Sequence, residues 1–339
     1  MVDLVIAGGG PAGLATALHA TRAGLSVVVR EPRAGVIDKA CGEGVMPDGA
    51  AHLEALGVRP AGEAIRGIRY CAPGRQADTP FRGPPGLGVR RTELHRALRQ
   101  AALAAGIPIE QAKVRAVEQQ GSGVLVDGTP AGYLIAADGL HSPLRRSLGL
   151  QATARGPVRY GLRRHLRRPP WTDHVEVHWS AHSEAYVTPV APDQVGIAIL
   201  TSRRAPYAEH LAGFPDLQAR LAGAEAASSV RGAGPLRQRA TRRVAGRVLL
   251  VGDAGGYVDA ITGEGVSLAL AQARAAVTAV AGDQPGRYEH TWRQIVRRHQ
   301  VLTGTLVAVG DSPARRLLVP AAQHLPRLFA AAVNEVART

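Results

Sequence analysis

The sequence predicts an α/β fold in which a parallel sheet of βαβ units carries an inserted antiparallel sheet and is followed by C-terminal helices. Short apolar runs that end in glycine, at residues 2–7 and 247–251, are typical of buried parallel strands. Several strand-like runs between residues 158 and 200 interrupt this pattern, and one of them alternates apolar and polar residues. From Gly265 onward the pattern is mainly helical.

A βαβ unit opens the chain. Residues 2–7 read as a strand, residues 12–23 as a helix and residues 26–30 as a second buried strand, all within about 30 residues. Further segments extend the same domain, and these are a helix at 92–105 and strands at 107–110, 114–119, 123–126 and 134–137.

The middle of the chain predicts the antiparallel sheet, with strands at 158–166, 174–179, 184–190 and 194–200. In the second of these strands apolar side chains alternate with polar ones, which indicates a sheet with one covered face. The apolar positions are Val175, Val177 and Trp179, and the polar ones are His174, Glu176 and His178.

The parallel-sheet domain is therefore expected in three pieces, residues 1–70, 91–155 and 241–282. The inserted sheet domain would take residues 71–90 and 156–240. Helices would fill residues 283–339, with breaks near four prolines, Pro285, Pro313, Pro320 and Pro326.

The composition indicates a globular chain with a basic surface. The 339 residues carry a formal net charge of +14, almost all from arginine, because Lys39 and Lys113 are the only lysines. The arginines are scattered and form no basic arm, so we expect no nucleic-acid binding and a field that favours a phosphate-bearing ligand. Cys41 and Cys71 predict neither a disulfide framework nor a metal site.

Targeting signals are not evident. The chain starts in a strand-like run and has no stretch of about 18 uninterrupted apolar residues, so we expect no signal peptide and no transmembrane helix. A cytoplasmic protein follows as the prediction. Residues 315–336 mix apolar residues with arginine, which leaves peripheral membrane contact open beside ordinary helix packing. The oligomeric state stays open.

A glycine-rich loop follows the first strand. Gly8, Gly10 and Gly13 fit the G-x-G-x-x-G pattern, with Pro11 and Ala12 opening the helix. In this pattern the glycines permit a tight turn, close approach to a pyrophosphate and close packing of the helix on the strand. Free N–H groups at the helix start then face the phosphates.

An acid ends the next strand. Glu31 lies 18 residues past Gly13 and is placed to accept ribose hydroxyls, with Pro32 and Arg33 beside it among the expected contacts. The loop and the acid together predict dinucleotide binding, but they do not distinguish FAD from NAD.

Two later segments favour FAD. Residues 137–142 (Ala-Asp-Gly-Leu-His-Ser) resemble the D-G motif of class A flavoprotein hydroxylases, and residues 251–256 resemble their G-D motif. The resemblance implies that Asp253 holds the ribityl chain of the flavin. It also assigns cofactor contacts to Asp138, Gly139 and Gly252.

Other cofactor contacts follow from the same family. Gly263, Gly265 and Val266 belong to a loop and helix start whose N-terminal dipole would face the flavin pyrimidine and favour the negative charge of a reduced flavin. Arg91, in the sequence Arg-Thr-Glu-Leu-His, matches the family's arginine that approaches FAD.

Residues 2–281 as a whole resemble the para-hydroxybenzoate hydroxylase superfamily, and within it the geranylgeranyl reductase-type branch. The branch signal is Asp-Lys-Ala-Cys-Gly-Glu-Gly at residues 38–44, which adds Cys41 and Gly42 to the expected cofactor contacts. The resemblance implies a Rossmann-like FAD-binding domain of the GR2 type without a separate nicotinamide domain, with NADPH or NADH as transient reductant.

This chain departs from the family in two places. Residues 259–262 read Asp-Ala-Ile-Thr where the hydroxylases commonly carry a proline. The C-terminal portion is also short for the prenyl reductases, which leaves less room for a long lipid tail.

The predicted function is that of an FAD-dependent oxidoreductase, and two reactions stay open. A flavin C4a-hydroperoxide would hydroxylate an apolar or aromatic, polyketide-like small molecule, or a reduced flavin would saturate a carbon–carbon double bond of an isoprenoid. The short C-terminal region and the superfamily default favour monooxygenation. A non-catalytic flavin-binding regulator is a third alternative.

Three residues are candidates for catalysis. The resemblance places Cys41 near the flavin ring with a role in reduction, and the alternative is a small buried thiol beside a glycine turn. Tyr186 and Thr188 share one face of their strand, which either lines the substrate cavity or packs as ordinary sheet.

Histidines of the sheet domain could supply a base, although we expect them to be exposed or hydrogen-bonded; they are His165, His174, His178 and His182. Arg163 could bind an acidic substrate group, although an exposed sheet arginine is the expectation.

Overall fold

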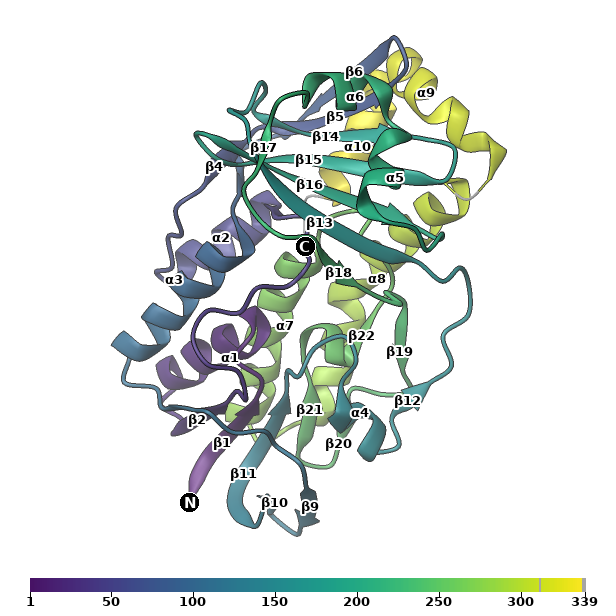
Figure 1. Cartoon of the computed structure of the whole chain (residues 1–339). Helices are drawn as coiled ribbons and strands as arrows, with labels where there is room; N and C mark the ends of the chain where they lie inside the picture. The colour runs from purple at the N-terminus through teal and green to yellow at the C-terminus, as the bar shows by residue number, and fades with distance from the viewer. Residues whose placement is uncertain (311, 337–339) are drawn as a thin grey trace.

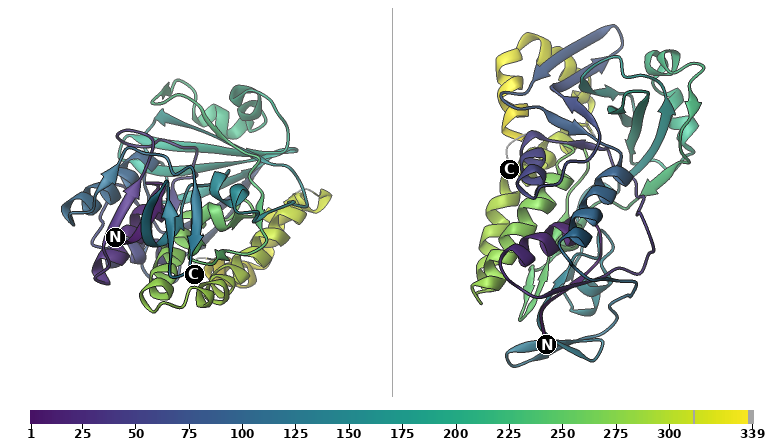
Figure 2. Two further views of the ribbon diagram at one scale, coloured as in Figure 1. Left: turned by 90° about the horizontal axis from the view of Figure 1, so that it is seen from below. Right: turned by 90° about the vertical axis from the view of Figure 1, so that its left-hand side faces the viewer.

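The computed structural model describes residues 1–310 and 312–336. It has a lower lobe built on a mainly parallel sheet and an upper lobe built on a mainly antiparallel sheet (Figure 1). The right-hand view of Figure 2 shows the C-terminal helices along one side of both lobes. The predicted fold class is thereby confirmed.

The lower sheet has β1 at its centre. Its strand order is β20-β21-β11-β1-β2-β8, and the hairpin of β9 and β10 continues from β11. Strands β21, β11, β1, β2 and β8 run parallel, while β20 is antiparallel to β21. The strands are β1 (Val2–Ala7), β2 (Val27–Arg30), β8 (Ile109–Glu110), β9 (Val117–Gln120), β10 (Gly123–Val126), β11 (Thr129–Ala136), β20 (Val244–Ala245) and β21 (Val248–Leu250).

Helices cover this sheet on one face. Because neighbouring residues of a strand point to opposite faces, Leu4 and Ile6 pack against the helices while Val5 packs on the other side. The helices of this layer are α1 (Pro11–Arg22), α2 (Pro47–Ala55), α3 (Arg91–Ala104) and α7 (Gly265–Ala281). Of these, α2 is not anticipated by the sequence.

The upper sheet has the order β17-β13-β16-β15-β14-β5-β6, with β18 also paired to β13. Strand β5 begins at Gly67, inside the stretch 1–70 expected for the first piece of the parallel-sheet domain, and it pairs in parallel with β14. The strands are β5 (Gly67–Ala72), β6 (Arg75–Pro80), β13 (Tyr160–Arg167), β14 (His174–Trp179), β15 (Ser183–Ala191), β16 (Gln194–Thr201), β17 (Glu225–Ala226) and β18 (Arg231–Ala233).

The two faces of the upper sheet meet different partners. Val175, Val177 and Tyr186 belong to an apolar cluster on the inner face, which includes Ile261 of the lower lobe and Val307 of a C-terminal helix. The outer face packs under α5 (Tyr207–Ala212) and α6 (Pro215–Arg220). The predicted alternation along residues 174–179 is confirmed, but the expectation of one covered face is wrong, because α5 and α6 cover the outer face as well.

Short elements complete the fold. There are two further three-stranded sheets among the described residues, with strand orders β3-β7-β4 and β12-β19-β22. The elements are β3 (Gly44–Val45), β4 (Glu63–Ile65), β7 (Gly86–Gly88), β12 (Gln151–Ala152), β19 (Gln238–Ala240), β22 (Gly256–Tyr257), α4 (Pro143–Ser147) and the 3₁₀ turn Gly252–Gly255.

The C-terminal region forms α8 (Gly286–Gly310), α9 (Leu318–His324) and α10 (Pro326–Val336). The expected break near Pro320 is wrong: this proline lies in the first turn of α9, where a backbone N–H would have no acceptor within the helix. In α10 the Asn334 side chain bonds the end of β6, donating to Pro80 O at 3.1 Å.

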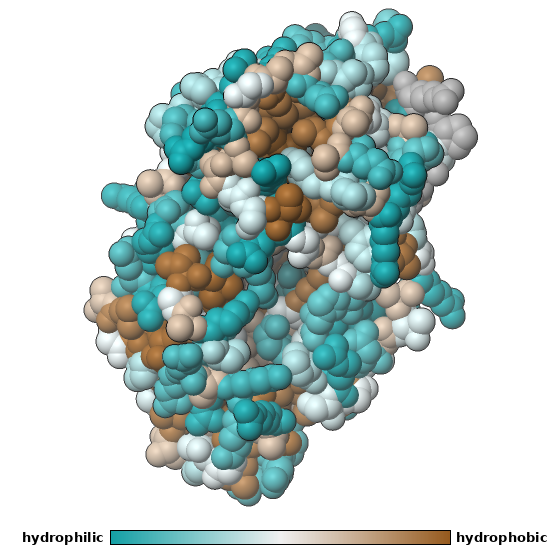
Figure 3. Space-filling model, viewed as in Figure 1, coloured by the Kyte–Doolittle hydropathy of each residue, from teal (hydrophilic) through white to brown (hydrophobic). Residues whose placement is uncertain are grey.

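No helix in residues 1–310 and 312–336 combines the length and hydropathy needed to cross a bilayer. On the face seen in Figure 3 the hydrophobic surface is divided into separate patches with hydrophilic surface between them.

The buried Arg145 joins two turns of the lower lobe. Its side chain donates to Leu140 O at 2.9 Å and to Ala254 O at 3.0 Å, and its Nε donates to Gln151 Oε1 at 2.7 Å. The guanidinium is fully buried, so each bond is made away from water. It therefore fixes the D-G turn against the G-D turn.

We predict that Arg145→Met lowers the free energy of unfolding by at least about 3 kcal/mol, because several buried carbonyl groups lose their donor. Urea denaturation followed by circular dichroism measures this. The matched control is Arg146→Met at the exposed neighbour, which we expect to change stability by less than about 0.5 kcal/mol. Equal effects of the two substitutions would contradict the assigned role.

Candidate functional site

The glycine loop lies between β1 and α1 at the carboxyl edge of the parallel strands. Gly8 has a φ of 110°, and a Cβ on Gly13 would lie 1.8 Å from Gly8 O, so both positions require glycine. A Cβ on Gly10 would have no atom within 4 Å. That space lies beside the free N–H groups of Ala12 and Gly13 in the first turn of α1, after Pro11, and it fits a pyrophosphate.

Glu31 lies beside this loop and is almost fully buried. Its carboxylate accepts hydrogen bonds from Gly9 N at 2.8 Å and from Arg33 Nε at 2.7 Å. Burial opposes ionisation, but these bonds outweigh it and hold the pKa of Glu31 below its usual value. A cavity of about 190 Å³, lined by both side chains, offers room for a ribose. Pro32 separates the two residues in the chain.

His95 is a site residue that the motifs did not single out. It lines the same cavity, and its Nδ1 accepts from Ile37 N at 3.2 Å. The ring proton must therefore lie on Nε2, which is 2.9 Å from Gly9 O in the glycine loop. Burial lowers the pKa of His95 to about 4, so the ring is neutral at pH 7.

Charged side chains gather around Asp253. This half-buried carboxyl follows Gly252, whose φ of 66° turns the chain after β21. Burial raises the pKa of Asp253, whereas the nearby Lys39 and Arg91 lower it. A half-buried acid with two cations near it suits a polar chain that carries both hydroxyl and phosphate groups.

Two buried polar atoms in this region lack partners among the described residues. They are Nη1 of Arg91 and Oδ1 of Asp138. The other carboxylate oxygen of Asp138 accepts from Leu144 N at 3.0 Å, and the adjacent Gly139 has a φ of 87°. Because buried polar groups are normally hydrogen-bonded, these two atoms indicate a missing polar ligand.

The start of α7 is the last segment that the sequence assigns to the cofactor. Gly263 has a φ of 71°, and a Cβ on Gly265 would lie 3.4 Å from the Tyr257 ring, with the half-buried Val266 next in the helix. Free N–H groups at this helix start favour negative charge. The intervening Glu264 is bonded to His299 of α8, with Oε2 and Nδ1 2.6 Å apart.

The loop that carries Cys41 is held by a buried acid. The Glu43 carboxylate accepts from Arg91 N at 2.8 Å and lies 2.6 Å from His165 Nε2 on β13. The backbone N–H of Glu43 donates to Cys41 Sγ at 3.4 Å. Burial, together with the Glu43 carboxylate, raises the pKa of the Cys41 thiol. Glu43 belongs to the motif of residues 38–44, but the sequence predicts no role for it, because its partners Arg91 and His165 lie far along the chain.

The inner face of the upper sheet closes over this loop. Thr188 Oγ1 donates to Gly42 O at 2.7 Å, and Tyr186 OH donates to Ile261 O at 3.1 Å. Both candidate residues of β15 therefore face the lower lobe. Gly42 also leaves open space where a Cβ would be.

The expectation of an exposed Arg163 is wrong. Its side chain is 1 % exposed and is paired with Asp38, because β13 turns this position toward the lower lobe. His165, two residues on, shares that face and its contact with Glu43. His174 pairs with Asp173 and His178 with Glu176, which leaves them hydrogen-bonded as expected.

The glycine loop at the start of α1, the buried acid Glu31, the carboxyl of Asp253 and the start of α7 match the arrangement that the sequence predicts, and this indicates an FAD-dependent oxidoreductase. Residues 1–287 match the family model of the FAD binding domain. The chain belongs to this family, and thus to the class A flavoprotein superfamily.

Relatives of known activity include both reductases and a monooxygenase. Menaquinone reductase of Mycolicibacterium smegmatis is 30% identical over 348 residues, covering 93% of this chain and 83% of that protein. Digeranylgeranylglycerophospholipid reductase 1 of Methanopyrus kandleri is 28% identical, covering 87% of each. The 12-dehydrotetracycline 5-monooxygenase/anhydrotetracycline 6-monooxygenase of Streptomyces rimosus is 31% identical, covering 74% of this chain and 57% of that protein.

Solved structures share the fold. A flavoprotein/dehydrogenase from Cytophaga hutchinsonii superposes with a TM-score of 0.86 at 17% identity, covering 98% of this chain and 93% of that one. At this identity the likeness concerns the fold alone.

We predict that Gly10→Ala lowers the affinity for FAD at least about tenfold, because its methyl group takes the space expected for the pyrophosphate. Stability without flavin should change by less than about 1 kcal/mol, since the methyl meets no protein atom. Isothermal titration with FAD and thermal denaturation measure the two effects. Gly13→Ala is the contrast, because its Cβ clash should destabilise the fold itself. Normal FAD affinity in the Gly10 variant would argue against this cradle.

The neutral state of His95 predicts a pH dependence of stability. Because its folded pKa lies near 4, below the ordinary 6.5, the unfolded chain binds the proton more tightly and stability falls as pH drops from about 6.5 to 4. Such a shift is worth about 3 kcal/mol. His95→Asn keeps an acceptor for Ile37 N but removes the titration, so its urea midpoint should fall less over this range. Parallel pH curves for the two proteins would contradict the prediction.

Proposed function

We propose that this protein is an FAD-dependent reductase that saturates a carbon–carbon double bond in the isoprenoid chain of a lipid, with NADPH or NADH as electron donor. FAD, when bound, supplies the hydride transfer. The substrate gains two hydrogens, one as hydride and one as a proton, while NAD(P)H is oxidised. This proposal differs from the monooxygenation that the sequence favoured.

The geometry of the Cys41 loop carries the proposal. The loop lies next to Arg91, which is assigned to the cofactor, since the Arg91 charge acts on the thiol and Glu43 N donates to Cys41 Sγ. Because burial raises its pKa, the thiol is protonated and neutral at pH 7, a state that suits a hydrogen donor beside an apolar substrate. The reductase relatives that cover most of this chain support the same reading.

The inner face of the upper sheet is an apolar layer that such a chain would enter. Its side chains are buried and pack against one another, so they exclude water, and a hydrocarbon ligand would have to displace part of this packing. The cluster includes Ile68, Val175, Tyr186, Leu236, Ile261 and Val307. It adjoins the start of α7 through Tyr257, so a bound chain would lie next to the proposed flavin edge.

Monooxygenation is the second candidate. The Streptomyces rimosus relative supports it. The helices α9 and α10 pack against β5 and β6, and this covering favours a compact aromatic substrate over a long chain. The same dry, apolar surface would serve this reaction.

Product mass separates the candidates. FAD-loaded protein is incubated with NADPH or NADH and either menaquinone or an aromatic polyketide, with and without oxygen. We expect menaquinone to gain two hydrogens under anaerobic conditions. Cys41→Ser should lower kcat at least about tenfold while the flavin content stays unchanged.

Other outcomes would redirect the assignment. A gain of one oxygen that requires O₂ would establish the monooxygenase instead. Full turnover by the Cys41→Ser variant would show that the Cys41 thiol is not the hydrogen donor. No consumption of NAD(P)H with any substrate would indicate a flavin-binding regulator.

A further inference from the structure

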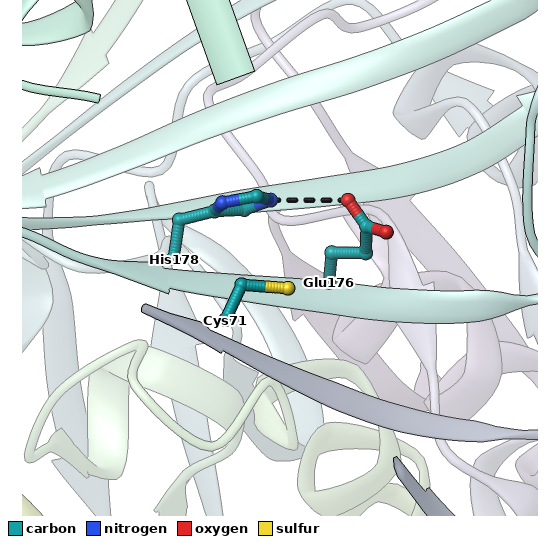
Figure 4. Close-up of side chains that lie close together, drawn as sticks. All are labelled: Cys71, Glu176 and His178. Atoms are coloured by element: carbon teal, nitrogen blue, oxygen red, sulfur yellow. Dashed lines mark hydrogen bonds and ion pairs between the residues drawn. The ribbon is translucent and has the colours of Figure 1, made fainter. Parts of the chain in front are cut away.

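Three side chains that commonly bind metals meet on the outer face of the upper sheet, the face opposite the flavin groove. Cys71 lies on β5, and Glu176 and His178 lie on β14 (Figure 4). The parallel pairing sets Cys71 directly opposite His178, and Glu176, two residues earlier, points to the same face. One ligand atom from each residue lies within 4.8 Å of the others.

We propose that Cys71, Glu176 and His178 bind a divalent cation of the zinc class. A thiolate, an imidazole and a carboxylate are the donors that zinc prefers. With zinc bonds of about 2.0–2.3 Å, ligand atoms of a tetrahedral site lie about 3.3–3.8 Å apart. Side-chain movements of about 1 Å would therefore complete the site. Binding would convert the Cys71 thiol to a thiolate and release its proton.

Neighbouring groups orient the ligands. Trp171 Nε1 donates to Glu176 Oε1 at 3.0 Å, which fixes the carboxylate and directs its other oxygen toward His178, 3.0 Å away. Such second contacts set ligand orientation in known metal sites. Glu176 is 1 % exposed, so its position is held by the sheet and by α6.

Two cations also approach the carboxylate. Arg69 and Arg220 each approach Glu176 Oε1 at 3.5 Å. Asp78 holds Arg69 through two bonds of 2.7 and 2.8 Å, and Arg220 lies over the Trp171 ring at 5.2 Å. Asp78 thus offsets the charge of Arg69, while Arg220 remains a cation near Oε1; Oε2 and the thiolate are the anionic donors that would face the metal.

A cavity gives access to the proposed site. All three ligands line a hollow of about 360 Å³, whose other wall includes Phe214, Pro215 and Arg220 from α6 and the residues before it. Three protein ligands leave the fourth position of a tetrahedral zinc for water or a small anionic ligand from this cavity. Spacing in the sequence could not reveal the site, and the proposal departs from the expectation of no metal.

Metal titration of the full-length, FAD-loaded protein tests the proposal. After removal of metals with a chelator, Co²⁺ is added and ligand-field absorption is followed at wavelengths beyond the flavin bands. We expect one equivalent of tetrahedral Co²⁺ that Zn²⁺ displaces. Cys71→Ser and His178→Ala should each lower the affinity at least about tenfold. The matched controls, Cys41→Ser and His174→Ala, should bind normally.

X-ray absorption of the zinc-loaded, unmodified protein is a second measurement that does not depend on how the variants fold. It should show one sulfur at about 2.3 Å and nitrogen or oxygen neighbours at about 2.0–2.1 Å. Absence of a sulfur neighbour, no binding at micromolar metal, or equal binding by Cys71→Ser, His178→Ala and the controls would overturn the proposal. None of these results depends on which reaction the flavin performs.

Discussion

The buried carboxylate of Glu43 is the contact on which the geometry between the lobes depends. It joins the loop of Cys41 to the first N–H of α3 in the lower lobe and to His165 of β13 in the upper lobe. Glu43 itself has a φ of 63°, a left-handed conformation that costs about 1–2 kcal/mol for a residue with a side chain. Such a conformation persists because its surroundings fix it, and it commonly marks a functional site.

The charges around this carboxylate explain how an arginine-rich chain carries buried arginines. Arg163 is paired with Asp38 and donates to Lys39 O at 3.1 Å, while Arg231 reaches the other oxygen of Asp38 at 3.3 Å. Burying a charge is costly unless it is paired and hydrogen-bonded. Asp38 and Glu43 in the loop of residues 38–43 therefore stabilise the buried Arg163 and His165 side chains of β13. These contacts also join the upper lobe to the lower lobe.

Local sequence patterns predicted the parts of the site that depend on backbone geometry. The roles of Gly8 and Gly13 follow from the turn and the close helix approach, and α7 begins at Gly265, where the helical pattern of the sequence starts. Such features are decided within about 20 residues of chain.

Features that depend on distant pairing escaped prediction. The burial of Arg163 requires Asp38, and the neutral ring of His95 requires Ile37 and Gly9. Neither partner set can be recognised before the chain is folded, because a single sequence carries no signal for such contacts. Hence the sequence predicted an exposed Arg163 only from the general tendency of charged side chains to lie at the surface.

A hydrogen-bonded turn takes the place of the proline that residues 259–262 lack. Asp259 Oδ1 accepts from Ile261 N at 3.1 Å, a local turn that restrains the backbone as proline would. Arg159 then ties Asp259 to the upper sheet at 3.2 Å, and Tyr186 OH holds Ile261 O. Because this turn leads directly into α7, the sheet that would bind substrate is fixed against the helix start that would face the flavin. A substrate bound on the inner face would thus meet a fixed helix start, and fixed positions of substrate and cofactor are the condition that either proposed reaction requires.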